Sequence, residues 1–218
     1  MKITIGYAGA VLLFLSANLS GDVLTRSKPS YETVQIGDQT WMTKNLDIGT
    51  FRNGDLIPQA KSNEEWERAG RAQSPAWCYY KNDTAIGKKY GRMYNWYALT
   101  DPRGVVPEGW HLPVLDEWIA FEKLVDGKPD GFLFQCSLKQ GKAGFCGLPG
   151  GYRSKDGNFT GIEEFTYLSG GTAEEILDSD KNKQTMIWGR GLHAVQRSHM
   201  RCGLRKDFGL YVRCIKDK

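Results

Sequence analysis

The chain has 218 residues, a formal net charge of +4 and a hydrophobic content of 40%. This length suits one domain with a substantial core, with or without a short appendage. The mild positive charge does not by itself imply a nucleic-acid partner. The 26 glycines and the scarcity of long periodic apolar runs argue against a helical bundle and favour short strands joined by many turns.

The N-terminus has the pattern of a secretory signal peptide. Lys2 precedes an apolar run over residues 5–15, which the polar residues from Asn18 onward bring to an end. The run is too short for a membrane span, so we expect no stable transmembrane segment in the mature chain. An uncleaved N-terminal anchor is the alternative. The predicted organisation is a signal peptide at 1–21, a polar linker at 22–30 and one domain at 31–217.

Local patterns predict the first elements of this domain. Residues 31–36 alternate in polarity, Gly37 and Asp38 give a turn signal, and residues 40–42 resume the pattern, which is typical of a β-hairpin. Farther along, Ser62 and Glu65 form a Ser-x-x-Glu capping box. It predicts a short helix over residues 63–69, with Gly70 at its end.

Residues 76–99 hold the densest group of aromatic side chains. Such a group is either a sugar-stacking platform or the core of a domain with few long helices, and the core is favoured because aromatic residues routinely dominate packing. Within it, residues 81–83 predict a turn whose oxygens have the chemistry to approach a cation. The aromatic residues are Trp77, Tyr79, Tyr80, Tyr90, Tyr94, Trp96 and Tyr97.

The clearest helix signal covers residues 114–125. Pro113 suits a helix start, and Gly127 suits a stop. Four apolar residues step by three, three and four positions and so share one face, which we expect to pack against a small antiparallel sheet. They are Leu115, Trp118, Phe121 and Val125, with Ile119 and Leu124 widening the stripe.

The C-terminal third predicts short strands between glycine-rich turns. We expect irregular β-structure over residues 150–161, then a strand at 165–168 and a polar loop at 169–183. Asp178, Asp180 and Asn182 in that loop resemble the start of a calcium site but lack the glycine and distal glutamate of an EF-hand, so a solvated loop is favoured. Three further strands are predicted at 185–188, 192–195 and 210–215.

A set of motifs in a fixed order resembles the Fibrobacter succinogenes major paralogous domain family of bacterial proteins. The resemblance covers residues 31–217 and implies an α+β, C-type-lectin-like fold of the formylglycine-generating-enzyme type, with short irregular antiparallel strands and one or two helices. One departure is the stretch 167–172, Tyr-Leu-Ser-Gly-Gly-Thr, where the family tends to have Trp-Trp-Ser-Ser-Thr. The motifs are Gly109-Trp-His-Leu-Pro113 with Glu117-Trp118, and the segments 34–42, 44–46, 77–83, 90–98, 148–153 and 209–217.

Five cysteines occur at positions 78, 136, 146, 202 and 214, and an exported chain permits disulfides. The family usually carries a cysteine where this chain has Val106, which removes the natural partner of Cys214. Cys202 is the candidate replacement, and Cys136 with Cys146 is a second candidate pair. No Cys-x-x-Cys or His-x-x-x-His spacing predicts a metal site. We therefore expect no cofactor, with calcium as the one candidate ion.

Residues 188–206 carry the strongest charge asymmetry, since they include five cations and two histidines but no acidic residue. In the resembling fold this region forms an exposed face, so an anionic glycan or other cell-surface ligand is the expected partner. The alternative is a solvated face whose charges meet carboxylates such as Glu163, Glu164 and Asp207. The predicted ligand-binding residues are Trp188, Arg190, His193, Arg197, His199 and Arg201.

The function predicted from these features is a non-catalytic binding or adhesion module, secreted, periplasmic or on the outer cell surface. No stretch offers a nucleophile with its base, a phosphate loop or a metal triad. Two alternatives stay open. One is a cysteine oxidase like the formylglycine-generating enzyme, which would use Cys202 and Cys214 to hold copper. The other is a purely structural envelope protein.

Overall fold

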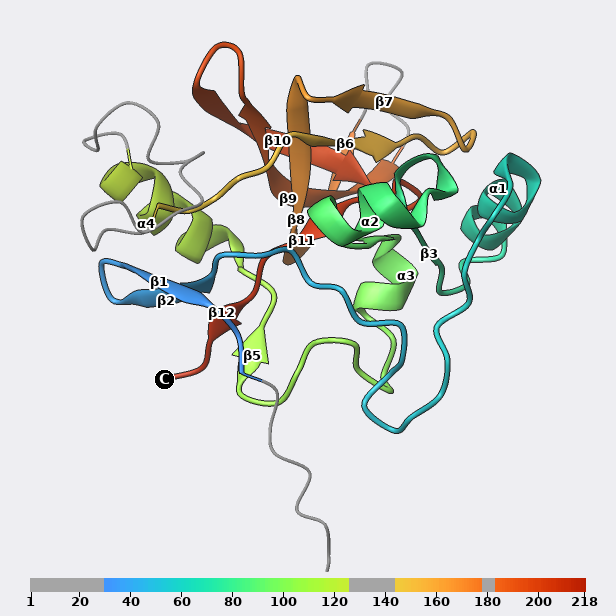
Figure 1. Cartoon of the computed structure of the whole chain (residues 1–218), viewed down its shortest axis with the longest axis horizontal. Helices are drawn as coiled ribbons and strands as arrows, with labels where there is room; N and C mark the ends of the chain where they lie inside the picture. Colours follow the sequence, from blue (N-terminus) through green and yellow to red (C-terminus); the bar gives the residue numbers. More distant parts are fainter. Residues whose placement is uncertain (1–29, 126–143, 178–182) are drawn as a thin grey trace, which may run out of the picture. The chain divides into compact units, whose positions relative to one another are not determined.

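The computed structural model describes residues 30–125, 144–177 and 183–218 (Figure 1). Residues 31–218 cluster as one unit of mixed α+β structure, in which strands predominate over helices. The α+β class predicted from the sequence is confirmed at this level. Three strands of the C-terminal half, with 13, 11 and 8 residues, are longer than the short strands expected. Four α-helices are described where one or two were expected.

A small sheet joins the two ends of the domain. The predicted hairpin forms from β1 (Thr33–Ile36) and β2 (Gln39–Met42), with Gly37 at a φ of 58° in the turn. β12 (Ile215–Lys216) pairs with β2 and with β5 (Trp110–His111), which gives the order β1-β2-β12-β5. The Gly-Trp-His motif therefore lies beside the C-terminal strand (Figure 1).

A larger sheet contains the long strands of the C-terminal half. Its order is β10-β9-β8-β6-β7, and β11 pairs in parallel with β8. β8 also pairs in parallel with β6, whereas its pairing with β9 is antiparallel. The strands are β6 (Gly150–Arg153), β7 (Phe159–Ile162), β8 (Phe165–Leu177), β9 (Lys183–His193), β10 (Ser198–Arg205) and β11 (Tyr211–Val212).

Four α-helices lie within the described ranges: α1 (Asn63–Arg71), α2 (Thr84–Tyr90), α3 (Trp96–Leu99) and α4 (Leu115–Val125). The capping box at α1 is confirmed, because the Ser62 hydroxyl accepts a hydrogen bond from the Glu65 amide at 3.2 Å. α1 runs past Gly70 to Arg71, one residue beyond the glycine expected to end it. A 3₁₀ turn, η1 (Tyr80–Asn82), and the short pair β3 (Trp77–Cys78) and β4 (Met93–Tyr94) complete the fold.

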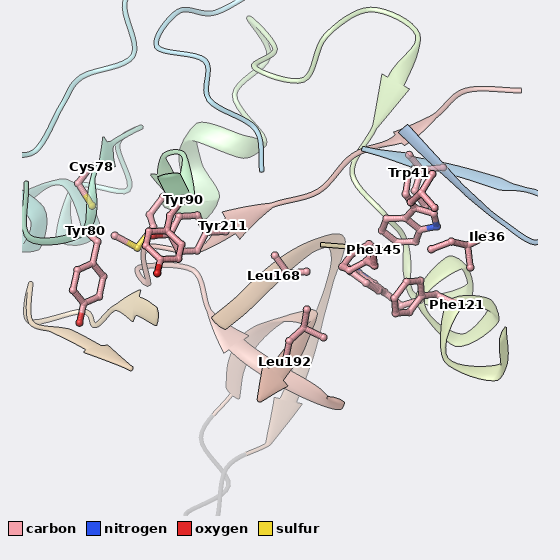
Figure 2. Packing of buried hydrophobic residues seen from close by; sticks show 14 of the residues in the cluster. Ile36, Trp41, Cys78, Tyr80, Tyr90, Phe121, Phe145, Leu168, Leu192 and Tyr211 are labelled. Atoms are coloured by element: carbon pink, nitrogen blue, oxygen red, sulfur yellow. The ribbon is translucent and has the colours of Figure 1, made fainter. Parts of the chain in front are cut away.

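The predicted face of α4 packs into the core. Trp118, Phe121 and Val125 are buried, and the ring centroids of Trp118 and Trp41 lie 4.8 Å apart. Figure 2 shows Trp41, Phe121 and Phe145 grouped together in this cluster. Leu124 does not belong to the buried face, because it remains 39% exposed. Leu115 and Ile119 are partly buried, so the fully buried stripe is narrower than the predicted one.

The aromatic residues between 76 and 99 are mostly core, as expected. Trp77, Tyr80, Tyr90, Tyr94 and Trp96 are buried. The two that remain half-exposed are Tyr79 and Tyr97.

Two predictions for the C-terminal strands are wrong. Residues 169–177 continue β8 instead of forming a loop, and residues 192–195 end β9 and enter a turn instead of forming a separate strand. Gly170 makes the continuation possible, because a Cβ at this position would lie 2.1 Å from the carbonyl oxygen of Trp188. The two glycines at 170 and 171 look like loop residues in the sequence, but here they permit close contact between neighbouring backbones.

Candidate functional site

The predicted ligand-binding residues do not form one exposed patch. Arg190 is 0% exposed, so the expectation that it binds an external ligand is wrong. Its Nε lies 2.8 Å from Oε1 of Glu122 on α4, and its guanidinium lies over the ring of Trp118. Burial lowers the pKa of Arg190, and the charge of Glu122 opposes that shift. Arg190 therefore links β9 to α4 inside the domain.

The other predicted residues are divided between the two faces of the sheet and the turn. Arg201 stands opposite Arg190 in the β9–β10 pair and lies 3.4 Å from Glu122. His193 points to the other face, where it stacks on Phe165 with ring centroids 6.2 Å apart. Arg197 occupies the exposed turn between β9 and β10, at a φ of 50°.

Trp188, Arg190 and Leu192 occupy alternate positions of β9 and therefore share a face. His199 lies on the same face, because it stands directly opposite Leu192. The Trp188 indole N–H donates a hydrogen bond to the carboxylate of Glu174 on β8. Residues 188–206 contain no acidic residue, but in the fold Glu122 pairs with Arg190 and Arg201, and Glu174 accepts from Trp188. The alternative interpretation, in which carboxylates elsewhere in the chain meet these cations, describes this part of the sheet better.

The predicted disulfide between Cys202 and Cys214 is absent, and both residues are free thiols. Cys202 aligns across the sheet with Gly189, Ser169 and Val212, so three strand spacings separate it from β11. At about 4.8 Å per strand this is about 14 Å, whereas a disulfide needs Cα atoms within about 7 Å. The same separation prevents the two sulfurs from sharing one copper ion. The other candidate pair includes Cys136, which lies outside the described residues.

The candidate calcium loop, Asp178 to Asn182, also lies outside the described residues. Asp83 of the other candidate cation site instead caps α2, where its carboxylate accepts from the amides of Ala85 and Ile86. Among the residues that the structure describes, no group of three or more His, Cys, Asp or Glu side chains could hold a metal ion. Nor does any described helix have the length and apolarity to cross a membrane.

An open polar pocket of about 350 Å³ lies where the start of β9 meets the end of β10. This volume falls at the lower end of the range of roughly 300–1,000 Å³ typical of small-molecule sites. Segments far apart in the sequence meet there: the turn after α1, helix α3, the first residues of β9 and the turn after β10. The lining residues are Gln73, Tyr97, Gln184, Thr185, Met186, Arg205, Lys206 and Asp207.

The turn after β10 is held firmly, which fixes one wall of the pocket. The Arg205 guanidinium donates to both carboxylate oxygens of Asp207, at 2.9 and 2.8 Å. The indole N–H of Trp66 on α1 donates to the Asp207 carbonyl oxygen at 3.1 Å, and the Trp96 amide on α3 donates to that of Lys206 at 3.0 Å. Two helices thus anchor the backbone of this turn, as a binding site on a scaffold requires.

Several polar groups of the pocket keep unused hydrogen-bonding capacity. Neither the Lys206 ammonium, the Gln73 amide nor the Thr185 hydroxyl has a side-chain partner among the described residues. The pKa of Tyr97 is raised, first by burial and then by the charge of Asp207, so its hydroxyl remains a hydrogen-bond donor. Arg205 and Asp207 neutralise each other, which leaves Lys206 as the net positive charge of the pocket.

A second pocket of about 370 Å³ lies beside α1 and is lined mainly by alanine and proline. Among its few polar side chains, the Glu65 carboxylate already accepts from the Lys61 amide at 2.6 Å, and the Ser74 hydroxyl donates to the Ala72 carbonyl oxygen at 3.3 Å. It offers little to orient a polar ligand, so the pocket at β9 and β10 is the better candidate site.

Sequence reasoning included Arg205 and Lys206 in the basic stretch and Tyr97 in the aromatic group, but it did not place them in one site, and it missed Gln73. No local signal marks Gln73, and none separates Tyr97 from the aromatic residues that were expected to be core. They become candidates only because folding brings α1 and α3 against the turn at Asp207.

Comparison with known proteins supports the family suggested by the motifs. The model of the Fibrobacter succinogenes major domain matches residues 34–216. No curated protein and no solved structure matches the chain.

Proposed function

This chain belongs to the Fibrobacter succinogenes major domain family, and on that premise we propose that it is an exported, non-catalytic binding module with a C-type-lectin-like fold of the formylglycine-generating-enzyme type. Its proposed ligand is a saccharide with one carboxylate, held in the pocket of Tyr97, Thr185 and Lys206. The proposed location is the outer cell surface or the extracellular medium. Export is supported by the apolar run at residues 5–15 that follows Lys2.

The observation that supports the proposal is that the side chains of Gln73, Thr185 and Lys206, which line this pocket, have no side-chain partner among the described residues. A sugar presents many hydroxyls, each both a donor and an acceptor, so it needs a pocket that mixes amides, hydroxyls and charges. Gln73, Thr185 and Tyr97 provide such groups, and the Tyr97 ring supplies a flat apolar wall for the C–H face of a sugar. Lys206 provides the partner for one carboxylate.

A binding role is also supported over the cysteine-oxidase alternative by the position of the thiols. Cys78 and Cys214 are buried, and burial raises the pKa of each thiol to about 12. A thiol with so high a pKa supplies little thiolate near neutral pH.

The test is a glycan array probed with the parent protein and two variants. The parent should bind uronic-acid or sialic-acid glycans, and affinity should fall as ionic strength rises, because the site is open to solvent. Lys206→Gln should lose about two- to fivefold in affinity, the range expected for one exposed charge pair. Lys88→Gln, which removes an exposed lysine on α2, should bind like the parent. Binding of no acidic glycan, or equal binding by Lys206→Gln, would reject the proposal.

A further inference from the structure

The outer edge of β10 has no strand partner among the residues that the structure describes. In the described part of the chain β10 pairs with β9 alone, in a continuous register without a bulge. Met200 is 52% exposed, and Gly203 is exposed as well, so solvent reaches the backbone at this edge. Residues 198–205 contain no proline and no lysine. Natural proteins use proline, charged side chains (above all lysine) and bulges to prevent edge strands from pairing with other chains, and of these β10 has only Arg201 and Arg205.

One face of β10 presents a partly paired arginine. Arg201 and Arg190 stand opposite each other and share the carboxylate of Glu122, at 3.4 and 2.8 Å. The shorter contact belongs to the buried Arg190, whereas the Arg201 side chain is 44% exposed and can accept a further carboxylate from outside. Arg197, in the turn just before the strand, adds an exposed cation with no side-chain partner among the described residues.

The opposite face of β10 is apolar. Cγ of Met200 and Sγ of Cys202 both lie 3.1 Å from the point where a Cβ on Gly191 would stand, and Cε1 of Tyr167 lies at the same distance. Because Gly191 has no side chain, Met200 and Cys202 converge over it beside the Tyr167 ring. A neighbouring strand would therefore meet apolar side chains at alternate positions on this face.

We infer that the edge of β10 accepts an extended segment of a partner protein in which acidic and apolar residues alternate. Backbone hydrogen bonds to the open edge would supply affinity, as in other cases of strand addition. The acidic side chains would lie on the face of Arg201, and the apolar ones on the face of Met200, because directly opposed residues of paired strands share a face. This surface is separate from the saccharide pocket and does not depend on it.

A second copy of this chain is a poorer occupant of the same edge. Two antiparallel β10 strands would bring Arg201 close to its own copy, and like charges across paired strands are destabilising. An acidic partner removes this conflict, so charge selects a different chain over self-association.

The test uses a capped octapeptide of alternating glutamate and valine, with fluorescence anisotropy as the readout. A peptide of the same composition with glutamates and valines in blocks should bind at least tenfold more weakly, because it cannot place one residue type on each face. Arg201→Gln should weaken binding by about two- to fivefold, as expected for one exposed charge pair. Lys206→Gln and Lys88→Gln should leave peptide binding unchanged, which separates this surface from the saccharide pocket.

Hydrogen exchange on the parent protein with bound peptide gives a readout that needs no variant. Strand addition should protect every second amide of β10, namely those that point away from β9, whereas binding through side chains alone should protect none. Equal affinity for the blocked peptide, absence of this alternating protection, or self-association of the parent without peptide would each overturn the inference.

Discussion

Glu122 on α4 provides the carboxylate for Arg190 on β9, with 2.8 Å between Oε1 and Nε and no exposure of the arginine side chain. This ion pair connects the amphipathic helix to the large sheet. It also explains why a stretch of sequence that contains no acid does not produce a strongly basic surface.

Removal of this carboxylate should destabilise the domain strongly. Glu122→Gln leaves Arg190 as a buried charge without a counter-ion, a change that typically costs about 3–5 kcal/mol. Urea unfolding of the parent and the variant measures the difference. The control is Glu67→Gln, which breaks the surface ion pair with Arg71, a side chain that is 71% exposed. It should lower the free energy of unfolding by at most about 0.5 kcal/mol. Equal effects of the two substitutions would mean that Arg190 does not rely on Glu122.

Gly170 should be required for the continuity of β8. Its Cβ would lie 2.1 Å from the Trp188 carbonyl oxygen, so Gly170→Ala must displace backbone and should lower the melting temperature markedly. Gly203→Ala on β10 is the matched control, because its Cβ would meet nothing nearer than 3.5 Å. The control should be near neutral or slightly stabilising. A melting temperature unchanged in Gly170→Ala would show that β8 and β9 are not paired so closely here.

His111 should make the stability of the fold depend on pH. Its ring nitrogens lie 2.6 Å from an Asp217 oxygen and 2.8 Å from a Glu117 oxygen. Burial acts to lower the pKa of His111, but the two carboxylates outweigh burial and hold it above the ordinary value of 6.5. Protonation therefore stabilises the folded state. The contribution is complete below the unfolded-state pKa and is lost as the pH rises through the folded-state pKa.

The measurement is thermal unfolding of the parent and of His111→Gln at about pH 6 and about pH 9. The stability advantage of the parent should be larger at the lower pH. The stability advantage of the parent over Asp217→Asn, which removes one of the two carboxylates, should also be larger at the lower pH, but by a smaller amount. An advantage that is constant with pH, or that grows toward alkaline pH, would contradict the charge assignment of this cluster.

The three free cysteines of the described part of the chain should differ in reactivity. Cys202 is half-exposed, whereas Cys78 and Cys214 are fully buried. Under native conditions an alkylating reagent should modify Cys202 first, and the two buried thiols should react only after unfolding. Peptide mapping without reduction should find no cross-link between Cys202 and Cys214. Recovery of such a cross-link from natively folded protein would refute the sheet order that separates β10 from β11.

Local chemistry explains which elements could be predicted from the sequence. The hairpin at Gly37, the cap at Ser62 and the buried stripe of α4 each depend on residues a few positions apart, and all three are confirmed. The course of β8 through Gly170 depends on contact with Trp188, which periodicity cannot reveal.

The candidate site was harder to predict for the same reason. The charge pattern of residues 188–206 omitted Glu122, which is 68 positions before Arg190 in the sequence. Likewise, the pocket at Lys206 needs α1 and α3, and only long-range packing brings them to β10. The sequence shows where the basic residues are, but only the folded structure shows which of them have an acidic partner.

The central claim is that the pocket at Lys206 binds an acidic saccharide, and an NMR titration of the ¹⁵N-labelled protein with a glucuronic-acid oligosaccharide tests it most directly. The account predicts shifts concentrated on the backbone amides of Tyr97, Thr185 and Lys206 and on the side-chain amide of Gln73, with a loss of these shifts in Lys206→Gln. Shifts centred on the turn at Arg197, or no shifts at all, would contradict it.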